Sequence, residues 1–298
     1  MNPGKMAALA LALALAAPNW AWPAENRQAM EREAVAVGLS RKAAEAARRK
    51  AHQRALALHQ MAARARAAMD DASGAIVEIH NCAVDLVRLN RPQEAMEKIN
   101  SALEIYEEEK KLQMGRDREK PMQEAMARVT LLRAIILADQ GQANEAGQWA
   151  GKAMEYCRKA DCLFKGRILN LQGRAALLAG DHKQAASAAR EALEASGKEG
   201  DEVESANAAR IMAQAAEAGG EGKKAYAEYK KALVMDRALK MGPKIAMDLM
   251  GLARASAMEG NQERARIFAK KALAVAEAAD YQAGAEAARA WLEKPAGE

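Results

Sequence analysis

The stretch GDHKQAASAAREAL, residues 180–193, decides the fold of this 298-residue chain. It starts with a glycine, places alanines five and twelve residues later, and closes with an apolar residue. The same arrangement occurs four more times along the chain. The other copies are Asn90, Ala95, Ile99, Ala102 and Leu103; Gly141, Ala146, Ala150, Ala153 and Met154; Gly220, Ala225, Tyr229, Ala232 and Leu233; and Gly260, Ala265, Ala269, Ala272 and Leu273. Turn residues spaced by 51, 39, 40 and 40 positions indicate a repeat architecture.

Each copy predicts a helical hairpin. The Gly or Asn can adopt the left-handed conformation that ends a helix, so the chain can reverse there. The alanines that follow share one face of the next helix and allow a close partner. The preceding helix also carries a small residue seven positions before the turn: Ala83, Ala134, Gly173, Ala213 and Ala253. Because one hairpin cannot cover its own apolar face, neighbouring hairpins are expected to stack.

This pattern resembles the tetratricopeptide repeat family over roughly residues 73–275. Gly173, Gly180, Ala185, Ala192 and Leu193 fall on the small and apolar signature positions of that family. The resemblance implies an all-α solenoid of about five stacked hairpins with a concave groove that binds a peptide or protein. A period of about 40 residues instead of 34 implies a variant with longer helices.

Composition supports a helical and globular chain. Half of the residues are apolar but only 4% are aromatic, which argues against an all-β sandwich or barrel. A net charge of +5 is too small for a disordered chain of this apolar content. Three cysteines are too few for a disulfide-dense scaffold or a four-cysteine zinc site.

The first residues predict an exported protein. Lys5 precedes an apolar run from Met6 to Ala17, and small residues follow, so residues 1–24 are typical of a signal peptide. The alternative is a buried N-terminal helix. The run is too short to span a bilayer, and no second apolar run of spanning length occurs. We therefore expect a periplasmic or extracellular location and no integral membrane span.

Residues 25–72 form a basic Ala/Arg-rich segment outside the regular array, with ten Lys/Arg and six Asp/Glu up to residue 71. We expect one or two helices here, broken near Gly38, with the charged residues forming a solvated face. A narrow seam predicts a partner helix, either in the same chain or in a second copy. Its residues are Ala55, Leu58, Ala62, Ala65 and Met69.

The solenoid and its cap are predicted to occupy residues 73–298. Residues 281–292 are typical of a capping helix. Between the first two repeats, eleven extra residues predict a helix extended through residues 107–111 and a flexible loop over residues 115–121.

Motifs for catalysis are missing. The chain has no Gly-rich phosphate loop, nucleophile elbow, HExxH or haem-attachment sequence, so we predict no enzyme, no cofactor and no metal site. The four histidines are expected to be solvated or packed. Cys157 and Cys162 lie where one repeat gives way to the next, and a turn there predicts either a disulfide or two separate buried thiols. Cys82 is expected to pack as a small apolar residue.

The resemblance also implies which side chains face the groove. They are Arg128, Arg167, Asn170, Arg174, Asn207, Arg210, Gln214 and Arg254, with Met247 and Met250 as an apolar patch. Five arginines favour an acidic segment or a C-terminal carboxylate as partner. The alternative is ordinary surface arginines paired with glutamates. Our leading hypothesis is an exported protein-binding scaffold. The alternative is a structural protein that forms homo-oligomers through its N-terminal helix, and export makes nucleic acid an unlikely partner.

Overall fold

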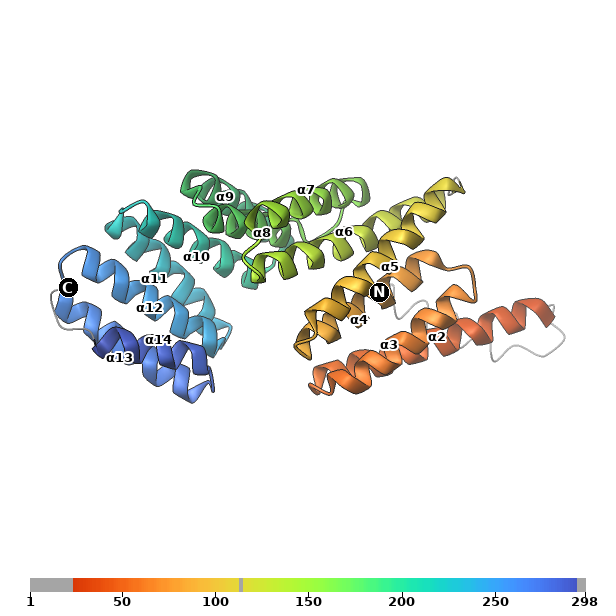
Figure 1. Ribbon diagram of the computed structural model, residues 1–298, viewed down its shortest axis with the longest axis horizontal. Helices are drawn as coiled ribbons and strands as arrows, with labels where there is room; N and C mark the ends of the chain where they lie inside the picture. The colour runs from red at the N-terminus through yellow and green to blue at the C-terminus, as the bar shows by residue number, and fades with distance from the viewer. Residues whose placement is uncertain (1–23, 113–114, 294–298) are drawn as a thin grey trace. The chain divides into compact units, whose positions relative to one another are not determined.

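The computed structural model describes residues 24–112 and 115–293, and within these ranges every regular element is an α-helix (Figure 1). The predicted signal peptide lies outside the described residues except for Ala24. The helices are α2 (Ala24–Arg48), α3 (His52–Ala67), α4 (Ala72–Arg88), α5 (Pro92–Lys111), α6 (Arg116–Asp139), α7 (Ala143–Ala160), α8 (Lys165–Leu178), α9 (His182–Glu199), α10 (Glu202–Ala218), α11 (Gly222–Ala238), α12 (Gly242–Met258), α13 (Gln262–Ala278) and α14 (Gln282–Glu293). The all-α repeat architecture is the one that the sequence predicts.

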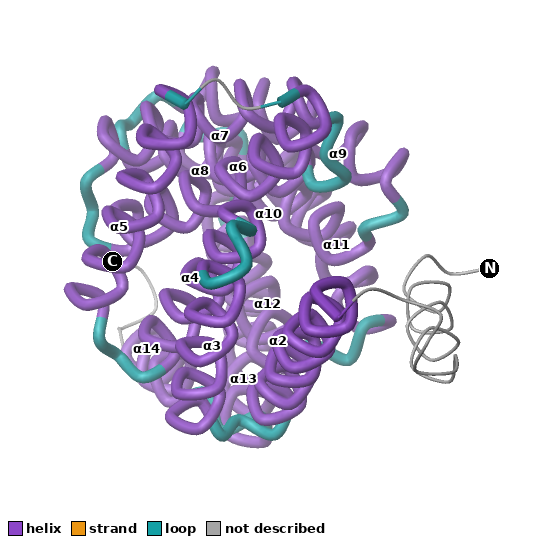
Figure 2. The backbone as a smooth tube through the Cα atoms, turned by 90° about the vertical axis from the view of Figure 1, so that its right-hand side faces the viewer, coloured by secondary structure: helices purple, strands orange, loops and turns teal. Residues whose placement is uncertain are grey.

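A residue in the left-handed conformation ends nearly every helix, and short loops follow it (Figure 2). The five predicted turn residues all have positive φ: Asn90, Gly141, Gly180, Gly220 and Gly260. Positive φ also occurs at turns that carry no Gly or Asn of the repeat pattern: Lys50, Asp70, Asp161, Gly200, Lys240 and Asp280. Of these, the turn at Asp161 is the one that the sequence predicts between Cys157 and Cys162. Turns therefore recur about every 20 residues, and Lys50 marks a hairpin that the search for Gly and Asn missed.

The predicted small residues form the contacts between helices. All ten alanines that follow the turns by five and twelve residues are completely buried. Gly173 shows why size matters, since a Cβ there would lie 3.1 Å from Ile211 Cγ2 and 3.3 Å from the carbonyl oxygen of Ala185. At Gly251 an added Cβ would overlap the buried ring of Tyr229. Close packing of helix on helix explains why alanine and glycine dominate these positions.

The chain divides into two compact units, residues 1–133 (unit 1) and 134–298 (unit 2), with the division inside α6. In unit 1, α3 packs against both α2 and α4, and α4 packs against α5. The boundary expected at residue 72 is therefore not a boundary between compact units, because α2 and α3 form one more hairpin stacked on α4. Ala55 and Ala62 of the predicted seam are buried in unit 1, so this seam faces helices of its own chain.

Two local expectations in unit 1 are wrong. α2 continues through Gly38, because a single glycine inside a helix costs only about 1 kcal/mol, and the chain turns at Lys50 instead. The loop expected over residues 115–121 is also absent, since α6 begins at Arg116 and contains Pro121 near its start. Pro121 is the sixth residue of this helix, so it forgoes one i→i−4 hydrogen bond, and the remaining hydrogen bonds of the 24-residue helix outweigh that local loss. The expected extension of α5 through Lys111 is confirmed.

A buried polar cluster connects α2, α3 and α4 in unit 1. His59 Nδ1 lies 2.6 Å from Glu78 Oε2, and Ser40 donates a hydrogen bond to Glu78 Oε1 at 2.6 Å. His52 Nδ1 lies 2.9 Å from Asp85 Oδ1. His59, Glu78 and Asp85 are each at least 95% buried. The sequence predicts histidines that are either solvated or packed. The histidines of this cluster are packed, and the groups that contact their ring nitrogens are carboxylates.

In unit 2, α8 to α13 form three hairpins, and α10 also touches α8 and α12. α14 begins one residue after the predicted start of the capping helix, and its Trp291 packs on the cluster around Leu249 and Leu252. A disulfide joins Cys157 to Cys162 across the turn at Asp161, with the two Cα atoms 5.0 Å apart. Cys82 is buried and has a free thiol.

Candidate functional site

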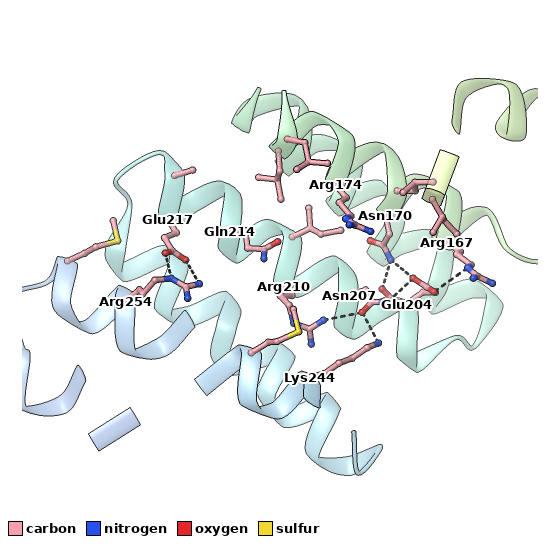
Figure 3. A pocket seen from close by; sticks show the side chains of 18 residues that line it. Arg167, Asn170, Arg174, Glu204, Asn207, Arg210, Gln214, Glu217, Lys244 and Arg254 are labelled. Carbon is pink, nitrogen blue, oxygen red and sulfur yellow. Dashed lines mark hydrogen bonds and ion pairs between the residues drawn. The ribbon is translucent and has the colours of Figure 1, made fainter. Parts of the chain in front are cut away.

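A groove of about 1030 Å³ lies along one face of α8, α10 and α12 in unit 2 (Figure 3). Seven of the eight side chains predicted to face a groove line this one: Arg167, Asn170, Arg174, Asn207, Arg210, Gln214 and Arg254. Each falls 13, 10 or 6 residues before the turn glycine of its own hairpin, so equivalent positions of three repeats meet on one surface. Met247 also lines the groove, whereas Met250 is buried in the core beside Leu249.

Arg128 does not belong with the other seven. It lies in unit 1, where it lines a separate cavity of about 430 Å³ and donates a hydrogen bond to Glu124 at 2.8 Å. The register that works for α8, α10 and α12 does not transfer to α6, because α6 is a longer helix and most of it, through Arg133, belongs to unit 1.

Arg210 forms the ionic base of the groove. Its Nε donates to Asp248 Oδ1 at 2.7 Å, and its Nη2 also bonds Asp236. The arginine is 6% exposed and both carboxylates are completely buried. Burial and the neighbouring Asp236, opposed by Arg210, raise the pKa of Asp248 to about 7. Arg210 therefore ties α10 to α11 and α12, and its charge is already used inside the protein.

The groove edge at the first turns of the three helices is rich in polar side chains. Asn170 Nδ2 donates to Glu204 Oε2 at 2.9 Å, and Asn207 Nδ2 donates to the same oxygen at 3.0 Å. The Lys244 amine donates to Asn207 Oδ1 at 2.9 Å. Arg167 lies 4.0 Å from Glu204 and is more than half exposed. Glu204 thus occupies both asparagine amides, while the two cations remain accessible from the groove.

Lys244 is a cation with poor compensation. Burial and the nearby Arg210 lower its pKa, although Asp236, Glu204 and Asp248 act in the opposite direction. Among the residues that the structure describes, no carboxylate lies within 4.0 Å of its amine. An anion bound at this point would therefore gain a charge partner that the protein does not supply.

The groove edge at the last turns is different. The Arg254 guanidinium binds Glu217 through two hydrogen bonds, one of them 3.1 Å long, and Tyr229 donates to the same carboxylate at 2.6 Å. Arg254 is therefore paired with Glu217, and its charge is compensated within the protein. Around it lie Leu177, Leu178, Ala218 and Met258, so this edge is mainly apolar. Arg174 lies in α8 between Arg167 at its first turn and Leu178 at its last turn, and it donates a hydrogen bond to Asp139 at 2.7 Å.

Sequence reasoning missed Lys244, Glu204 and Glu217. The first two lie 16 residues before the turn glycines Gly260 and Gly220, one helical turn before the predicted positions. Extending the predicted stripe by that turn would have found both. Glu217 lies only three residues before Gly220, where a charged residue is ordinary at a helix end, so its pairing with Arg254 required the structure.

Within residues 24–112 and 115–293 no group of three or more His, Cys, Asp or Glu side chains is arranged to hold a metal ion. None of the described helices combines the length and apolar character that crossing a membrane requires.

Comparison with known proteins identifies the fold. The chain matches no protein-family model and no curated protein sequence. Solved structures do match. One is a Signal Transduction ATPase with Numerous Domains from Pyrococcus horikoshii, which has a tetratricopeptide repeat sensor. It gives a TM-score of 0.68 at 19% identity, over 89% of this chain and 39% of that one. A Rap protein complexed with Competence and Sporulation Factor gives 0.63 at 17% identity, over 88% and 70%. BtubC from P. vanneervenii gives 0.58 at 14% identity, over 84% and 92%. The chain is a tetratricopeptide-like helical-repeat solenoid.

Proposed function

We propose that this protein is a non-catalytic scaffold that binds an acidic peptide or protein segment in the groove of unit 2. The observation that carries this proposal is the meeting of seven predicted side chains from three repeats on one surface of about 1030 Å³. Five of the side chains that line it are Arg or Lys and two are Glu. Arg210 and Arg254 are paired with carboxylates of the protein, so the accessible cations are Arg167, Arg174 and Lys244. Accessible cations along an open groove favour anionic segments through charge-assisted hydrogen bonds.

The similar solved structures support a binding role. One of them, the Rap protein, is complexed with the Competence and Sporulation Factor. Stacked hairpins provide an extended rigid surface without catalytic residues. The fold by itself does not define a function, so the proposal rests on the groove.

Affinity capture with matched charge reversals tests this function. Arg167→Glu with Arg174→Glu reverses two exposed groove cations, and Arg174 is paired only at the surface. Arg210 is unsuitable for this test because its removal would leave two buried carboxylates. Lys183→Glu with Arg190→Glu makes the same charge change on exposed positions of α9. We expect a salt-sensitive partner to be lost only from the groove variant; equal capture by both variants would exclude the groove.

We also propose that the protein is exported to the periplasm or the extracellular space. The leader-like sequence of residues 1–24 supports this, and a disulfide such as Cys157–Cys162 suits an oxidising compartment. Cell fractionation with N-terminal sequencing tests it: export predicts a processed chain outside the cytoplasm, and an intact cytoplasmic chain would contradict it.

A further inference from the structure

The two edges of the unit 2 groove differ in chemistry because α8, α10 and α12 run in the same direction. Each is the first helix of its hairpin, so their first turns lie together along one edge (Figure 3). We define the first-turn edge by Arg167 and Lys244 and the last-turn edge by Leu178 and Met258. The first-turn edge carries accessible cations, and the last-turn edge is apolar.

Apolar side chains of the last-turn edge are exposed to solvent. Leu178 is 47% exposed and Met258 is 42% exposed. Met247, which is 40% exposed, lies nearer the first-turn edge, at the position that Arg167 has in α8. The charges nearby are already neutralised, since Arg254 and Glu217 bind each other. Clustered apolar side chains next to accessible cations are typical of a surface that binds an amphipathic ligand.

The groove also indicates the conformation of the ligand. An extended peptide needs partners for its backbone N–H and C=O groups, and side-chain amides are the usual source. Here the Asn170 and Asn207 amide nitrogens both donate to Glu204, and Asn207 Oδ1 accepts from Arg210 and Lys244. Among the described lining residues, Asn170 Oδ1 and the Gln214 amide remain without a hydrogen bond, which is few partners for the backbone of an extended peptide. The rest of the floor, such as Leu171 and Ile211, is apolar. A helix satisfies its own backbone and needs no such partners.

From these observations we infer that the groove binds an acidic amphipathic helix lying across α8, α10 and α12. Its carboxylates face the first-turn edge, and its aliphatic side chains face the last-turn edge. Lys244 and Arg167 determine the specificity for acidic residues, and Met258 and Leu178 that for aliphatic ones. Three neighbouring helices at about 10 Å spacing span about 20 Å, which corresponds to about 14 residues of a bound helix. This inference rests on the proposed function.

Selection from a displayed library of random peptides of about 14 residues on the full-length chain tests the inference. We expect enriched sequences to carry Asp or Glu on one flank and Leu, Ile or Met at i, i+3, i+4 and i+7 on the other. Acidic sequences without that apolar spacing would overturn the helix but leave the proposed function intact. Enriched sequences without acidic residues would overturn both.

Fluorescence anisotropy with the most enriched peptide then tests the two edges. Lys244→Met and Arg167→Gln should each weaken binding, with Lys244→Met losing at least tenfold, about 1.4 kcal/mol. Met258→Gln should weaken the same peptide without changing its salt dependence. Lys183→Glu on α9 is the matched control and should bind as the parent chain does. Unchanged binding by Lys244→Met, with an unchanged helical circular dichroism signal, would overturn the first-turn edge.

Discussion

Each unit contains one buried ionic cluster, and the two clusters use different cations. In unit 1, His59 joins Glu78, with Asp85 3.8 Å away on its other side. In unit 2, Arg210 joins Asp236 and Asp248. A guanidinium presents several N–H donors in a planar fork, so Arg210 binds both carboxylates, whereas His59 lies within hydrogen-bond distance of Glu78 alone. The ionic base under the groove of unit 2 is therefore one cation shared by two carboxylates, and the cluster of unit 1 contains a single close pair.

Both clusters leave one carboxylate oxygen without a hydrogen bond among the described residues: Asp85 Oδ2 in unit 1 and Asp236 Oδ1 in unit 2. Buried charges of this kind add little net stability, but removing one partner is costly because the remaining charge is uncompensated. The largest and most informative perturbations should therefore come from single substitutions of the two cations.

Arg210→Met should have the largest effect on stability. It removes the only cation bound to Asp236 and Asp248 among the described residues, so we expect a loss of about 3–5 kcal/mol of unfolding free energy. Urea denaturation measures the loss, and hydrogen exchange should place it in α10, α11 and α12. The triple variant Arg210→Met with Asp236→Leu and Asp248→Leu removes the charges together and should recover much of the loss. If Arg210→Met alone is as stable as the parent chain, the ion pairs of Arg210 with Asp236 and Asp248 are not needed to stabilise unit 2.

His59→Leu should have a smaller effect, about 2 kcal/mol, because Glu78 keeps the hydrogen bond from Ser40. The double variant with Glu78→Met tests the reason, since removal of both partners should cost less than the sum of the two single changes. Additive losses would mean that His59 and Glu78 do not interact in unit 1.

The two clusters also show what the sequence could and could not predict. The repeat pattern predicts the stripe of Arg167, Arg174 and Arg254 because equivalent positions of stacked hairpins must face one side. It cannot show that Arg210, in the same stripe, is buried and paired, because Asp236 belongs to the opposite helix of the hairpin and Asp248 to the next repeat. Pairing between repeats depends on packing across a hairpin, which spacing within one helix does not report.

The hairpin of α2 and α3 was missed for a related reason. Its turn is formed by Lys50, and a lysine in the left-handed conformation has no recognisable signature. Backbone conformation there is determined by the packing of α3 against α2 and α4, since Lys50 itself has no preference for positive φ. The turns at Asn90, Gly141, Gly180, Gly220 and Gly260 could be predicted because the repeat keeps them in register, whereas the turn at Lys50 lies outside that register.

Removing the disulfide should destabilise unit 2 alone, with a smaller loss of unfolding free energy than Arg210→Met. Cys157→Ser with Cys162→Ser opens a short loop in unit 2, and the chain-entropy model gives a loss of about 2 kcal/mol. Exchange protection should fall near the end of α7 and the start of α8 and stay unchanged in unit 1. Burial raises the pKa of the Cys82 thiol to about 12, so mass spectrometry of the native parent chain should show one slowly alkylated thiol and one disulfide. Two rapidly alkylated thiols would contradict this pairing.

The smallest expected difference between the two clusters is in how the free energy of unfolding depends on pH. Burial raises the pKa of Asp248 to about 7, so between pH 4 and 7 the folded chain holds a proton that the unfolded chain has released. Stability should therefore fall as pH rises through this range, by at most about 1.4 kcal/mol per pH unit from this group. Burial also raises the pKa of Glu78, but hydrogen bonds from His59 and Ser40 outweigh it and leave the value lowered. The contribution of Glu78 should persist above its usual pKa and disappear only in stronger acid.

Asp248→Asn and Glu78→Gln separate these two slopes. Urea denaturation from pH 4 to 7.5 should give a flatter profile for Asp248→Asn than for the parent chain. Glu78→Gln should instead differ in slope only below about pH 4.5, where the parent carboxylate takes up its proton. If Asp248→Asn follows the parent profile throughout, Asp248 is ionised at neutral pH. Arg210 would then balance two full negative charges, and the anion-binding character of the groove would depend on Arg167 and Lys244 alone.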